Sequence, residues 1–393
     1  MEIKPSVTLY DIYGPGYVFN QRASYRNMQW LPDSVSQHSD TGRLLSIAGK
    51  MPILCHSGVI EPSSLSILKE SGLQLANKIH TYCDERSYYK KLNEFNHSKD
   101  KVVVNFPHLL EELNYNKYWI APELIAYLNN KGNLKDLVPK QNLARRKVLS
   151  ISDFAQEKNF PFGLPFVAKA ATDEPQGGGI EVVICKNNAD LQYAKQLFNS
   201  CNFVVMEEQI PILRNYCVQF VQTYKGDFIY LGAAEQIINE GKYTGNWVTQ
   251  EDNQLPEKVI QLGEQIMEKA VSLGYYGIAG FDIVISEDNR IIAIDLNFRM
   301  NASTVALLLK ESIMESLQVN TLKFRNFKTF VSLNKFERTI KTFIQQKRLV
   351  PLSIYNPSNL NSDEPIILYS ILVGNSKEEV NKIEQQLLNQ LEC

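Results

Sequence analysis

Residues 280–299 read GFDIVISEDNRIIAIDLNFR, and this stretch decides the fold that the sequence predicts. In its second half, Asp295, Asn297 and Arg299 alternate with large apolar residues. Successive side chains of a β-strand point to opposite faces, so the alternation predicts a strand with one polar and one apolar face. The polar face then carries a carboxylate, an amide and a guanidinium in a row.

A hairpin is expected inside this stretch, because residues 287–289 (EDN) are typical turn residues between two apolar runs. Antiparallel pairing could then set Asp282 beside Asp295 on the polar face. Two carboxylates and the amide oxygen of Asn297 suit Mg²⁺, which prefers oxygen ligands and leaves coordination positions for ATP phosphates. Arg299, with its rigid fork of donors, would meet a γ-phosphate or a tetrahedral intermediate. The alternative, an exposed charged sheet face, fits less well with apolar residues at every second position.

A glycine-rich segment lies earlier in the chain, where residues 169–180 read KAATDEPQGGGI. Lys169 ends an apolar, strand-like run, and Gly177 to Gly179 open the next one. Successive glycines form a flexible loop whose N–H groups can approach phosphate oxygens closely, and a lysine adds a compact positive charge. A plain hairpin turn with an exposed lysine is the alternative, and this segment alone does not decide between the two.

A third segment, residues 203–211, is an apolar strand that ends in two acids and a proline. Backbone groups that are freed at such a strand end can pair with adenine. The alternative is a solvated acidic strand end, so Glu207 and Glu208 gain meaning only from the other two segments.

In this order, the three segments resemble the ATP-grasp superfamily of carboxylate ligases, and the resemblance covers residues 139–303. It implies two α+β subdomains that hold ATP between antiparallel sheets, with the glycine-rich loop as a lid. It also implies the roles of individual residues. Metal ligands would be Asp282, Asp295 and Asn297, and the catalytic residues would be Arg299 and Lys169. Besides Lys169, the residues that bind ATP would be Gly177, Gly178, Gly179, Glu207, Glu208 and Ile210, the last two through their backbone.

The resemblance further implies a second lysine before the lid strands. Lys140 is the candidate, because it precedes a helix-like segment at residues 142–149, and Arg145 or Lys147 could serve instead. In two places the chain departs from the family pattern. Asp295 stands where a glutamate is usual, which draws the metal closer to the strand or holds it through water. Asn215 stands where a ribose-binding glutamate is often found, and it can still bond a hydroxyl.

The order of elements predicts three domains. Residues 1–135 alternate strands with helices and are expected to form a Rossmann-like α/β domain with a parallel sheet, similar to the domain that precedes the ATP-grasp module. Residues 136–322 are expected to form the α+β ATP-grasp module, and residues 323–393 a small C-terminal α/β unit. This layout is similar to the peptide and amino-acid ligases of natural-product biosynthesis.

The composition excludes several other classes of protein. The chain has 393 residues and a net charge of −2, so no excess of basic residues points to nucleic acid or to an anionic membrane. No apolar run approaches the ~20 residues of a membrane span, and the N-terminus lacks the features of a signal peptide. Six scattered cysteines are typical of a cytoplasmic protein with reduced thiols. All five histidines lie in the first third, which argues against a Ser-His-Asp hydrolase or a histidine-rich zinc site.

The resulting functional hypothesis is an ATP-dependent ligase with Mg²⁺, or Mn²⁺, as cofactor. A substrate carboxylate attacks the γ-phosphate to give an acyl phosphate and ADP, and an amine then displaces phosphate to form an amide. The substrates are expected to be an amino acid or a small peptide, bound near the polar, aromatic loop at residues 236–247. Transfer to the thiol of an acyl carrier protein, a non-catalytic nucleotide-binding protein, a plain kinase and a homodimeric assembly stay open.

Overall fold

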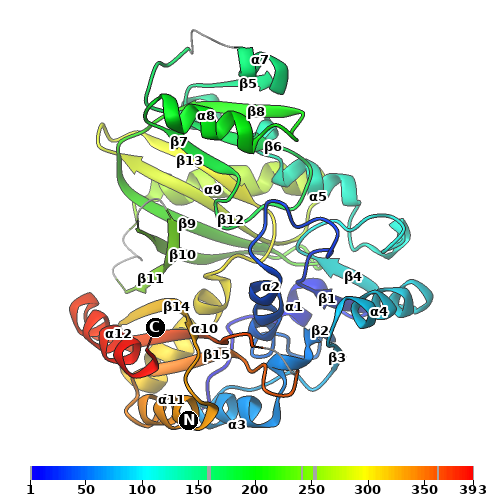
Figure 1. Cartoon of the computed structure of the whole chain (residues 1–393), viewed down its shortest axis with the longest axis vertical. Coiled ribbons are helices and arrows are strands. Elements are labelled where there is room, and N and C mark those ends of the chain that lie inside the picture. Colours follow the sequence, from blue (N-terminus) through cyan, green and yellow to red (C-terminus); the bar gives the residue numbers. More distant parts are fainter. Residues whose placement is uncertain (1, 157–160, 240–241, 251–254, 361–362, 393) are drawn as a thin grey trace.

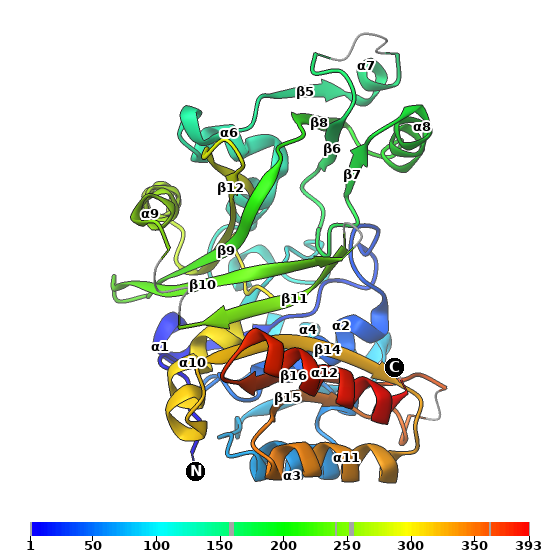
Figure 2. The same cartoon turned by 90° about the vertical axis from the view of Figure 1, so that its left-hand side faces the viewer.

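The computed structural model describes residues 2–156, 161–239, 242–250, 255–360 and 363–392. Three β-sheets organise this part of the chain. The smallest domain, which contains β5 to β8, lies at one end of the longest axis, and the N- and C-terminal regions lie together at the other end (Figure 1). The eight-stranded sheet connects these two ends, as the second view makes clear (Figure 2).

The N-terminal sheet has four parallel strands in the order β3-β2-β1-β4. Parallel strands require crossover connections, and helices supply most of them here. The predicted α/β domain with a parallel sheet is therefore confirmed. Its strands are Tyr17–Asn20 (β1), Ile53–His56 (β2), Ile79–Tyr82 (β3) and Lys101–Val104 (β4), and its helical elements are Leu9–Tyr13 (α1), Ser34–Asp40 (α2), Thr41–Leu44 (η1), Pro62–Glu70 (α3), Glu85–His97 (α4), Pro122–Asn129 (α5), Lys131–Asn133 (η4) and Leu134–Leu137 (α6).

The largest sheet has eight antiparallel strands in the order β13-β12-β9-β10-β11-β14-β16-β15. The hairpin predicted at residues 287–289 is present, since β12 pairs with β13, and β9 and β10 form a second hairpin. Helices α9 and α10 pack on this sheet and bury its apolar side chains. The strands are Ile212–Gln222 (β9), Phe228–Asn239 (β10), Lys242–Thr249 (β11), Gly277–Ser286 (β12), Ile291–Asn297 (β13), Thr321–Thr329 (β14), Leu349–Tyr355 (β15) and Ile366–Gly374 (β16), and the helices are Glu257–Ser272 (α9) and Thr304–Leu317 (α10).

The third sheet is small and antiparallel, in the order β5-β8-β6-β7. Its apolar face is covered by two helices, and the resulting core is separate from the main core of the protein. Together with the larger sheet it gives the α+β module that the sequence predicts. The elements are Arg146–Ser150 (β5), Phe166–Ala171 (β6), Val182–Cys185 (β7), Phe203–Glu208 (β8), Ile151–Gln156 (α7) and Asn188–Leu197 (α8).

Strand β5 corrects one prediction. The segment at residues 142–149 contains good helix formers and was expected to be helix-like, yet Arg146–Ser150 forms an edge strand that pairs with β8. Helix propensity amounts to less than about 1 kcal/mol per residue, so pairing along a preformed strand outweighs it. The correction matters for the site, because the strand register places Arg146 opposite Glu207.

The C-terminal region continues the large sheet. Strand β14 (residues 321–329) pairs with β11 on one side and with β16 on the other, so the boundary expected at residues 322/323 falls inside a strand. The helices Leu333–Gln345 (α11) and Lys377–Leu391 (α12) pack against these last strands. The division into three domains stays a prediction, with the qualification that one sheet runs through the second and third units.

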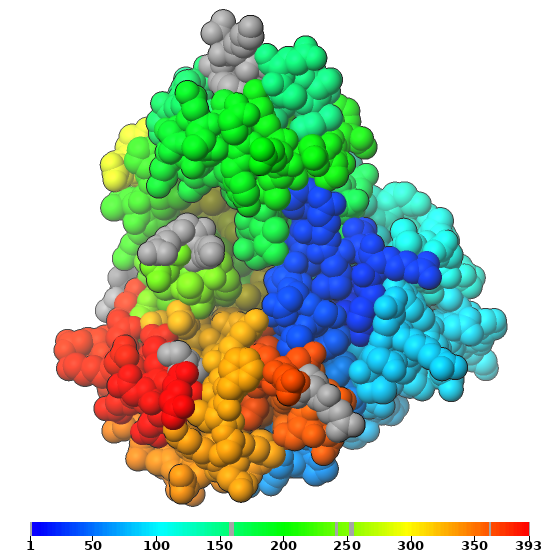
Figure 3. Space-filling model, in the orientation of Figure 1, coloured from blue at the N-terminus to red at the C-terminus, as the bar shows by residue number. Residues whose placement is uncertain are grey.

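Trp30 joins the N-terminal region to the small sheet. It lies in the loop between β1 and α2, but its indole is 1% exposed and packs in the core of the small sheet, with its ring centroid 6.0 Å from that of Phe198. The indole Nε1 donates to Glu174 Oε2 at 3.1 Å, and the Gly177 N–H donates to the Trp30 carbonyl at 2.9 Å. The space-filling view shows the N-terminal residues in dark blue in contact with the green residues of the small sheet (Figure 3). The glycine-rich loop is thus held against the N-terminal region.

Within the described residues, no helix has both the length and the apolar character needed to cross a membrane.

Candidate active site

A cavity of about 650 Å³ lies between the small sheet, the large sheet and the N-terminal region. The three segments singled out in the sequence all contribute to its lining. The lining residues from these segments are Lys169, Gly177, Gly178, Gly179, Glu207, Glu208, Gln209, Ile210, Asp282, Ile294, Asp295, Asn297 and Arg299. Residues that are far apart in the chain therefore meet at one site, in a hollow below the small sheet (Figure 3).

Two carboxylates form the centre of the site. Asp282 on β12 and Asp295 on β13 are direct partners in the strand register, which confirms the predicted pairing. Burial, followed by the nearby Asp295 carboxylate, raises the pKa of Asp282 to about 7. Burial opposes the ionisation of Asp295 as well, but the ammonium groups of Lys131 and Lys169 outweigh it and lower the pKa of Asp295. The pair therefore contains one firmly ionised carboxylate, Asp295, and one whose ionisation burial opposes, Asp282.

Lys131, which the sequence interpretation missed, neutralises this pair. It begins the short helix η4, its side chain is buried, and its Nζ lies 2.6 Å from Asp295 Oδ1 and 3.1 Å from Glu181 Oε1. Burial alone would lower the pKa of Lys131, but the two carboxylates raise it, so the ammonium group stays charged. Lys131 and Glu181 both line the cavity.

Lys169 lies on strand β6 of the small sheet and lines the same cavity as Lys131. Its Nζ lies 2.6 Å from Glu207 Oε2 and donates to the carbonyl oxygen of Ile294 at 2.7 Å. The second oxygen of Glu207 lies 3.5 Å from Arg146 Nη1, and Arg146 also donates to the Lys131 carbonyl. These contacts connect both lysines to the strand end at Glu207.

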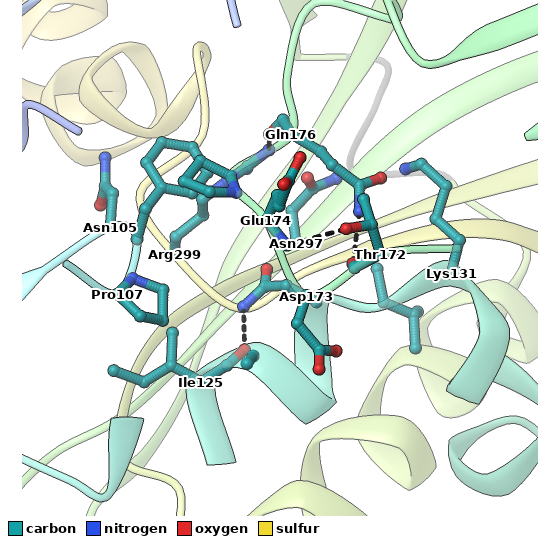
Figure 4. Close-up of a pocket in the computed structure, with 15 residues that line it drawn as sticks. Asn105, Pro107, Ile125, Lys131, Thr172, Asp173, Glu174, Gln176, Asn297 and Arg299 are labelled. Carbon is teal, nitrogen blue, oxygen red and sulfur yellow. Dashed lines mark hydrogen bonds between the residues drawn. The ribbon is translucent and has the colours of Figure 1, made fainter. Parts of the chain in front are cut away.

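Arg299 reaches from the end of β13 to the lid loop. Its Nη2 donates to the Gln176 carbonyl at 2.9 Å, its guanidinium lies 5.0 Å from the ring centroid of Phe106, and its Nε is buried without a hydrogen-bond partner among the residues that the structure describes. Figure 4 shows Arg299 and Asn297 converging with the lid residues Thr172 and Gln176. An unpaired donor on a buried guanidinium is suited to an incoming anion.

The three glycines of the lid loop differ in their backbone conformation. Gly178 and Gly179 both have φ +74°, a left-handed conformation that side chains rarely adopt, whereas Gly177 does not. The three form a tight turn that lines the cavity. The Gly177 N–H donates to the Trp30 carbonyl, so the N–H groups of Gly178 and Gly179 are the candidates for contact with phosphate oxygens.

The strand end at Glu208 differs from the prediction, in which the backbone of Glu208 binds adenine. Glu208 pairs with Arg145 at 2.8 Å and with Arg290 at 2.9 Å, and its N–H donates to the Arg145 carbonyl at 3.0 Å. That N–H is therefore not available to adenine. The N–H of Ile210 has no hydrogen-bond acceptor within the described part of the chain and remains the better candidate.

Asn215 lies where a ribose hydroxyl is expected. Its Nδ2 donates to Gln236 Oε1 at 2.8 Å, and its Oδ1 is buried without a partner in the described ranges. Gln236 opens the segment at residues 236–247 that was expected beside the substrates, and its side chain also hydrogen-bonds Asp282. One amide thus connects the predicted ribose contact to the carboxylate pair.

Lys140 does not take part in the site. It is exposed at the start of a short 3-10 helix and is absent from the cavity lining, and Arg145 and Lys147, the two alternatives, are also exposed. Lys131 is the lysine that lines the cavity together with Lys169. It had no detectable signal in the sequence, because it stands in a polar loop whose partners are Glu181 and Asp295, far along the chain.

The segment at residues 236–247 was expected to be a polar loop. It forms the ends of β10 and β11, apart from residues 240–241, which lie outside the described residues. Gln236, Ile238, Tyr243, Thr244 and Asn246 line the cavity, so its place beside the site is as expected. Strand pairing between β10 and β11, with a bulge after Ile237, replaces the loop.

The donor set fits a divalent cation. The described residues contain no group of three or more histidine, cysteine or acidic side chains of the kind that holds a metal ion without other ligands. Asp282, Asp295 and Asn297 nevertheless offer oxygen ligands, and Asp282 Oδ1 is buried without a partner in the described structure. A few protein oxygens with room for phosphate oxygens is the coordination that Mg²⁺ prefers.

Two protein-family models match the chain. The ATP-grasp domain of L-aspartate–L-methionine ligase matches residues 144–297, and the N-terminal domain of the same enzyme matches residues 8–126. The two matches do not overlap, and they follow each other in the order of the domains. Together they cover most of the chain, including the segments at residues 169–180 and 203–211 and the segment at residues 280–299 as far as Asn297.

Solved structures of ATP-grasp proteins share the fold over nearly the full length. N5-carboxyaminoimidazole synthetase from Staphylococcus aureus with ADP has a TM-score of 0.60 and 13% identity, with 99% of each chain covered. An L-amino acid ligase from Bacillus licheniformis has a TM-score of 0.54 and 15% identity, with 98% of each chain covered. Biotin carboxylase from Campylobacter jejuni has a TM-score of 0.55 and 14% identity, with 95% of this chain and 91% of that chain covered.

Proposed function

Because the chain belongs to the ATP-grasp superfamily of carboxylate ligases, we propose that its substrates are L-aspartate and L-methionine. The chain is an ATP-dependent ligase that joins amino acids through a peptide bond. The specific pair is supported by two family models of the same enzyme, which match different regions of the chain. In this proposal aspartate supplies the carboxyl group and methionine supplies the amine.

One observation carries the catalytic part of the proposal. The buried pair Asp282 and Asp295 faces the same cavity as three basic side chains, Lys131, Lys169 and Arg299. A triphosphate with a divalent cation presents the complementary charges. Phosphoryl transfer requires little covalent chemistry from the protein and depends on positioning and charge neutralisation, which this arrangement provides.

The roles of the individual residues follow from their positions. Lys131 and Lys169 bind phosphate oxygens, and the turn at Gly177 to Gly179 covers them. The Ile210 N–H meets adenine, and Asn215 binds a ribose hydroxyl. Mg²⁺ or Mn²⁺ would be held by Asp282, Asp295 and Asn297, and when bound it neutralises phosphate charge.

The reaction has two steps. A carboxylate oxygen of aspartate forms a bond to the γ-phosphorus as the bond to the ADP oxygen breaks, which gives an acyl phosphate. The neutral amine of methionine then attacks the acyl carbon, inorganic phosphate leaves, and the amine loses a proton. Arg299 lies at the lid and would stabilise negative charge on the transferring phosphoryl group and on the tetrahedral intermediate.

The cavity lining also suits a methionine side chain. Phe106, Met300 and Phe324 line the cavity beyond the carboxylate pair. Aromatic rings and a second thioether contact sulfur favourably, by about 0.3–1.5 kcal/mol for a sulfur–aromatic contact. Apolar lining does not by itself select methionine, so the family models carry the identity of the amine.

The experiment is to incubate the protein with Mg·ATP, aspartate and methionine and to measure ADP, phosphate and dipeptide together. We expect all three in equal amounts, with aspartyl-methionine identified by mass spectrometry. Hydroxylamine, added in place of methionine, should trap the acyl phosphate as aspartyl hydroxamate. A mass gain on a phosphopantetheinyl carrier protein without dipeptide would favour a thiol acceptor, and ATP binding without any ADP would contradict the proposal.

A further inference from the structure

The cavity extends beyond the ATP half of the site into a second, less charged half. There its wall consists of the N-terminal elements α2 and η1 and of the C-terminal strands β14 and β16. The polar residues on this wall are Gln37, Asp40, Arg43, Asn326 and Tyr369. None of them belongs to the segments that the resemblance covers, and the function proposed above gives them no role.

The backbone that carries Arg43 is firmly fixed. Gly42 packs so closely on β15 that a Cβ atom there would lie 2.1 Å from Ser353 Oγ. Ser353 Oγ in turn donates to the Ser39 carbonyl at 2.9 Å. Both contacts lie just before Arg43 in the chain and both involve Ser353, so they hold this segment against the C-terminal sheet, which is the rigidity that a substrate-binding residue requires.

The guanidinium of Arg43 is buried, with its side chain 5% exposed, and only part of it is engaged. Nη1 donates to the Ala302 carbonyl at 3.0 Å, and Nε lies 3.1 Å from Asp40 Oδ1 in an ion pair without hydrogen-bond alignment. The group also lies 5.3 Å from the ring centroid of Tyr369. Across the described ranges, Nη2 has neither a hydrogen-bond acceptor nor an acidic partner, while the residue lines the cavity.

This arrangement favours a carboxylate that belongs to an amino acid. A guanidinium edge with free donors matches the two oxygens of a carboxylate. Asp40 already balances the charge of Arg43, so a doubly charged anion such as phosphate would be repelled by the aspartate. A ligand with one carboxylate and a neighbouring amine meets no such repulsion.

The position relative to the reacting atoms indicates which amino acid this is. Ala302, which accepts from Arg43, lies in the loop that follows Arg299, and Arg299 bonds to the lid. The carboxylate that is phosphorylated must lie beside Arg299 and the γ-phosphate. Arg43 contacts the same loop at Ala302, three residues farther along the chain, so its carboxylate would be a second one, separate from the carboxylate beside Arg299.

We propose that Arg43 binds the α-carboxylate of the amino acid that supplies the amine. The inference rests on the function proposed above, since it requires a second amino acid at the site. Arg43 would then be a specificity residue outside the ATP-grasp segments, and the enzyme would require a free carboxylate on its acceptor.

The test compares methionine with methionine amide as acceptor, in the wild-type protein and in Arg43→Gln and Arg43→Lys. We expect the wild type to prefer methionine. In Arg43→Gln, kcat/KM for methionine should fall by about 10- to 100-fold, the loss expected for a charge-assisted hydrogen bond, while the amide is affected much less. Arg43→Lys should restore part of the preference for methionine. Arg26→Gln, at an exposed arginine outside the cavity lining, is the matched control.

The outcomes separate the alternatives. Equal losses for methionine and its amide would assign Arg43 a purely positioning role and overturn the inference. Loss of aspartyl hydroxamate in Arg43→Gln would indicate that Arg43 binds a carboxylate of the donor, aspartate. This result would also overturn the inference. If the wild type forms no hydroxamate at all, the proposed function itself fails, and the inference fails with it. Thermal melting of each variant shows whether it is folded.

Discussion

The two halves of the cavity are built in different ways. The ATP half uses side chains that lie close together in the sequence, on strands β12 and β13 and in the lid loop at residues 169–180. The acceptor half gathers single residues from opposite ends of the chain, such as Arg43 and Tyr369. The ATP half also concentrates charge, whereas the acceptor half has one balanced ion pair. The difference suggests that one half binds ATP and the other half binds the acceptor amino acid. Substitutions in each half can test this separation.

The largest effect is expected from the carboxylate pair. Asp295→Asn should lower kcat/KM for ADP formation by about a thousandfold, since it removes a metal ligand and leaves the Lys131 charge without its closest partner. The hydroxamate assay should show the same loss, because the defect lies in the first step. Asp288→Asn, on the exposed hairpin turn, serves as the control. Equal activity in the two variants would show that this end of the cavity is not the catalytic end.

The next effect distinguishes Lys131 from Lys140. Lys131→Gln should reduce kcat/KM for ATP by roughly a hundredfold, because a buried charge that faces phosphate is lost. Lys140→Gln should change the same constant by less than about twofold, since this lysine is exposed. Steady-state kinetics at varied ATP measures both. The reverse ranking would restore the original sequence-based assignment.

Stability should depend on pH through Asp282. Its pKa is raised to about 7 by burial and then by Asp295, so the folded protein binds this proton more tightly than the unfolded chain does. Stability without metal should therefore fall as pH rises from about 4 to 7, by up to roughly 4 kcal/mol. Melting in the presence of a chelator measures this. Asp282→Asn should flatten the slope, and Mg²⁺ should stabilise the wild type more at pH 8 than at pH 6.

A substitution in the acceptor half should leave the first step largely intact. Gly42→Ala introduces a Cβ atom 2.1 Å from Ser353 Oγ and must shift η1, so KM for methionine should rise by about tenfold. Hydroxamate formation should fall much less than dipeptide formation. A parallel loss in both assays would indicate that the two halves are mechanically linked and would contradict the separation.

The smallest effect concerns the ribose. Asn215→Ala should raise KM for ATP by a few-fold, the amount expected for a neutral hydrogen bond. 2′-Deoxy-ATP and 3′-deoxy-ATP identify the hydroxyl, because the variant should no longer distinguish one of them from ATP. If the variant keeps its preference against both analogues, Asn215 contacts Gln236 alone.

The same contrast explains how much the sequence could predict. The register of Asp282 and Asp295 was predictable, because alternation and a hairpin turn are local patterns. Lys131, Glu181 and Arg43 were not, because the partners that bring them to the site are far along the chain. Residues 142–149 were misread for a related reason, since strand pairing with β8 outweighed their helix propensity.

Trp30 has a further consequence for the mechanics of the protein. Its indole is supplied by the N-terminal region but fills the interior of the small sheet, so the core of the small sheet is incomplete without the N-terminal region. If the lid moved outward and the Trp30 loop stayed in place, a cavity of the size of an indole would open in the small sheet. The cost would resemble that of truncating a buried tryptophan, which is typically about 3–5 kcal/mol. The loop and the lid are therefore expected to travel as one body. The hinge of this ligase then lies at the base of the Trp30 loop as much as at the strands of the lid, and nucleotide exchange involves a segment that contains none of the nucleotide-binding residues.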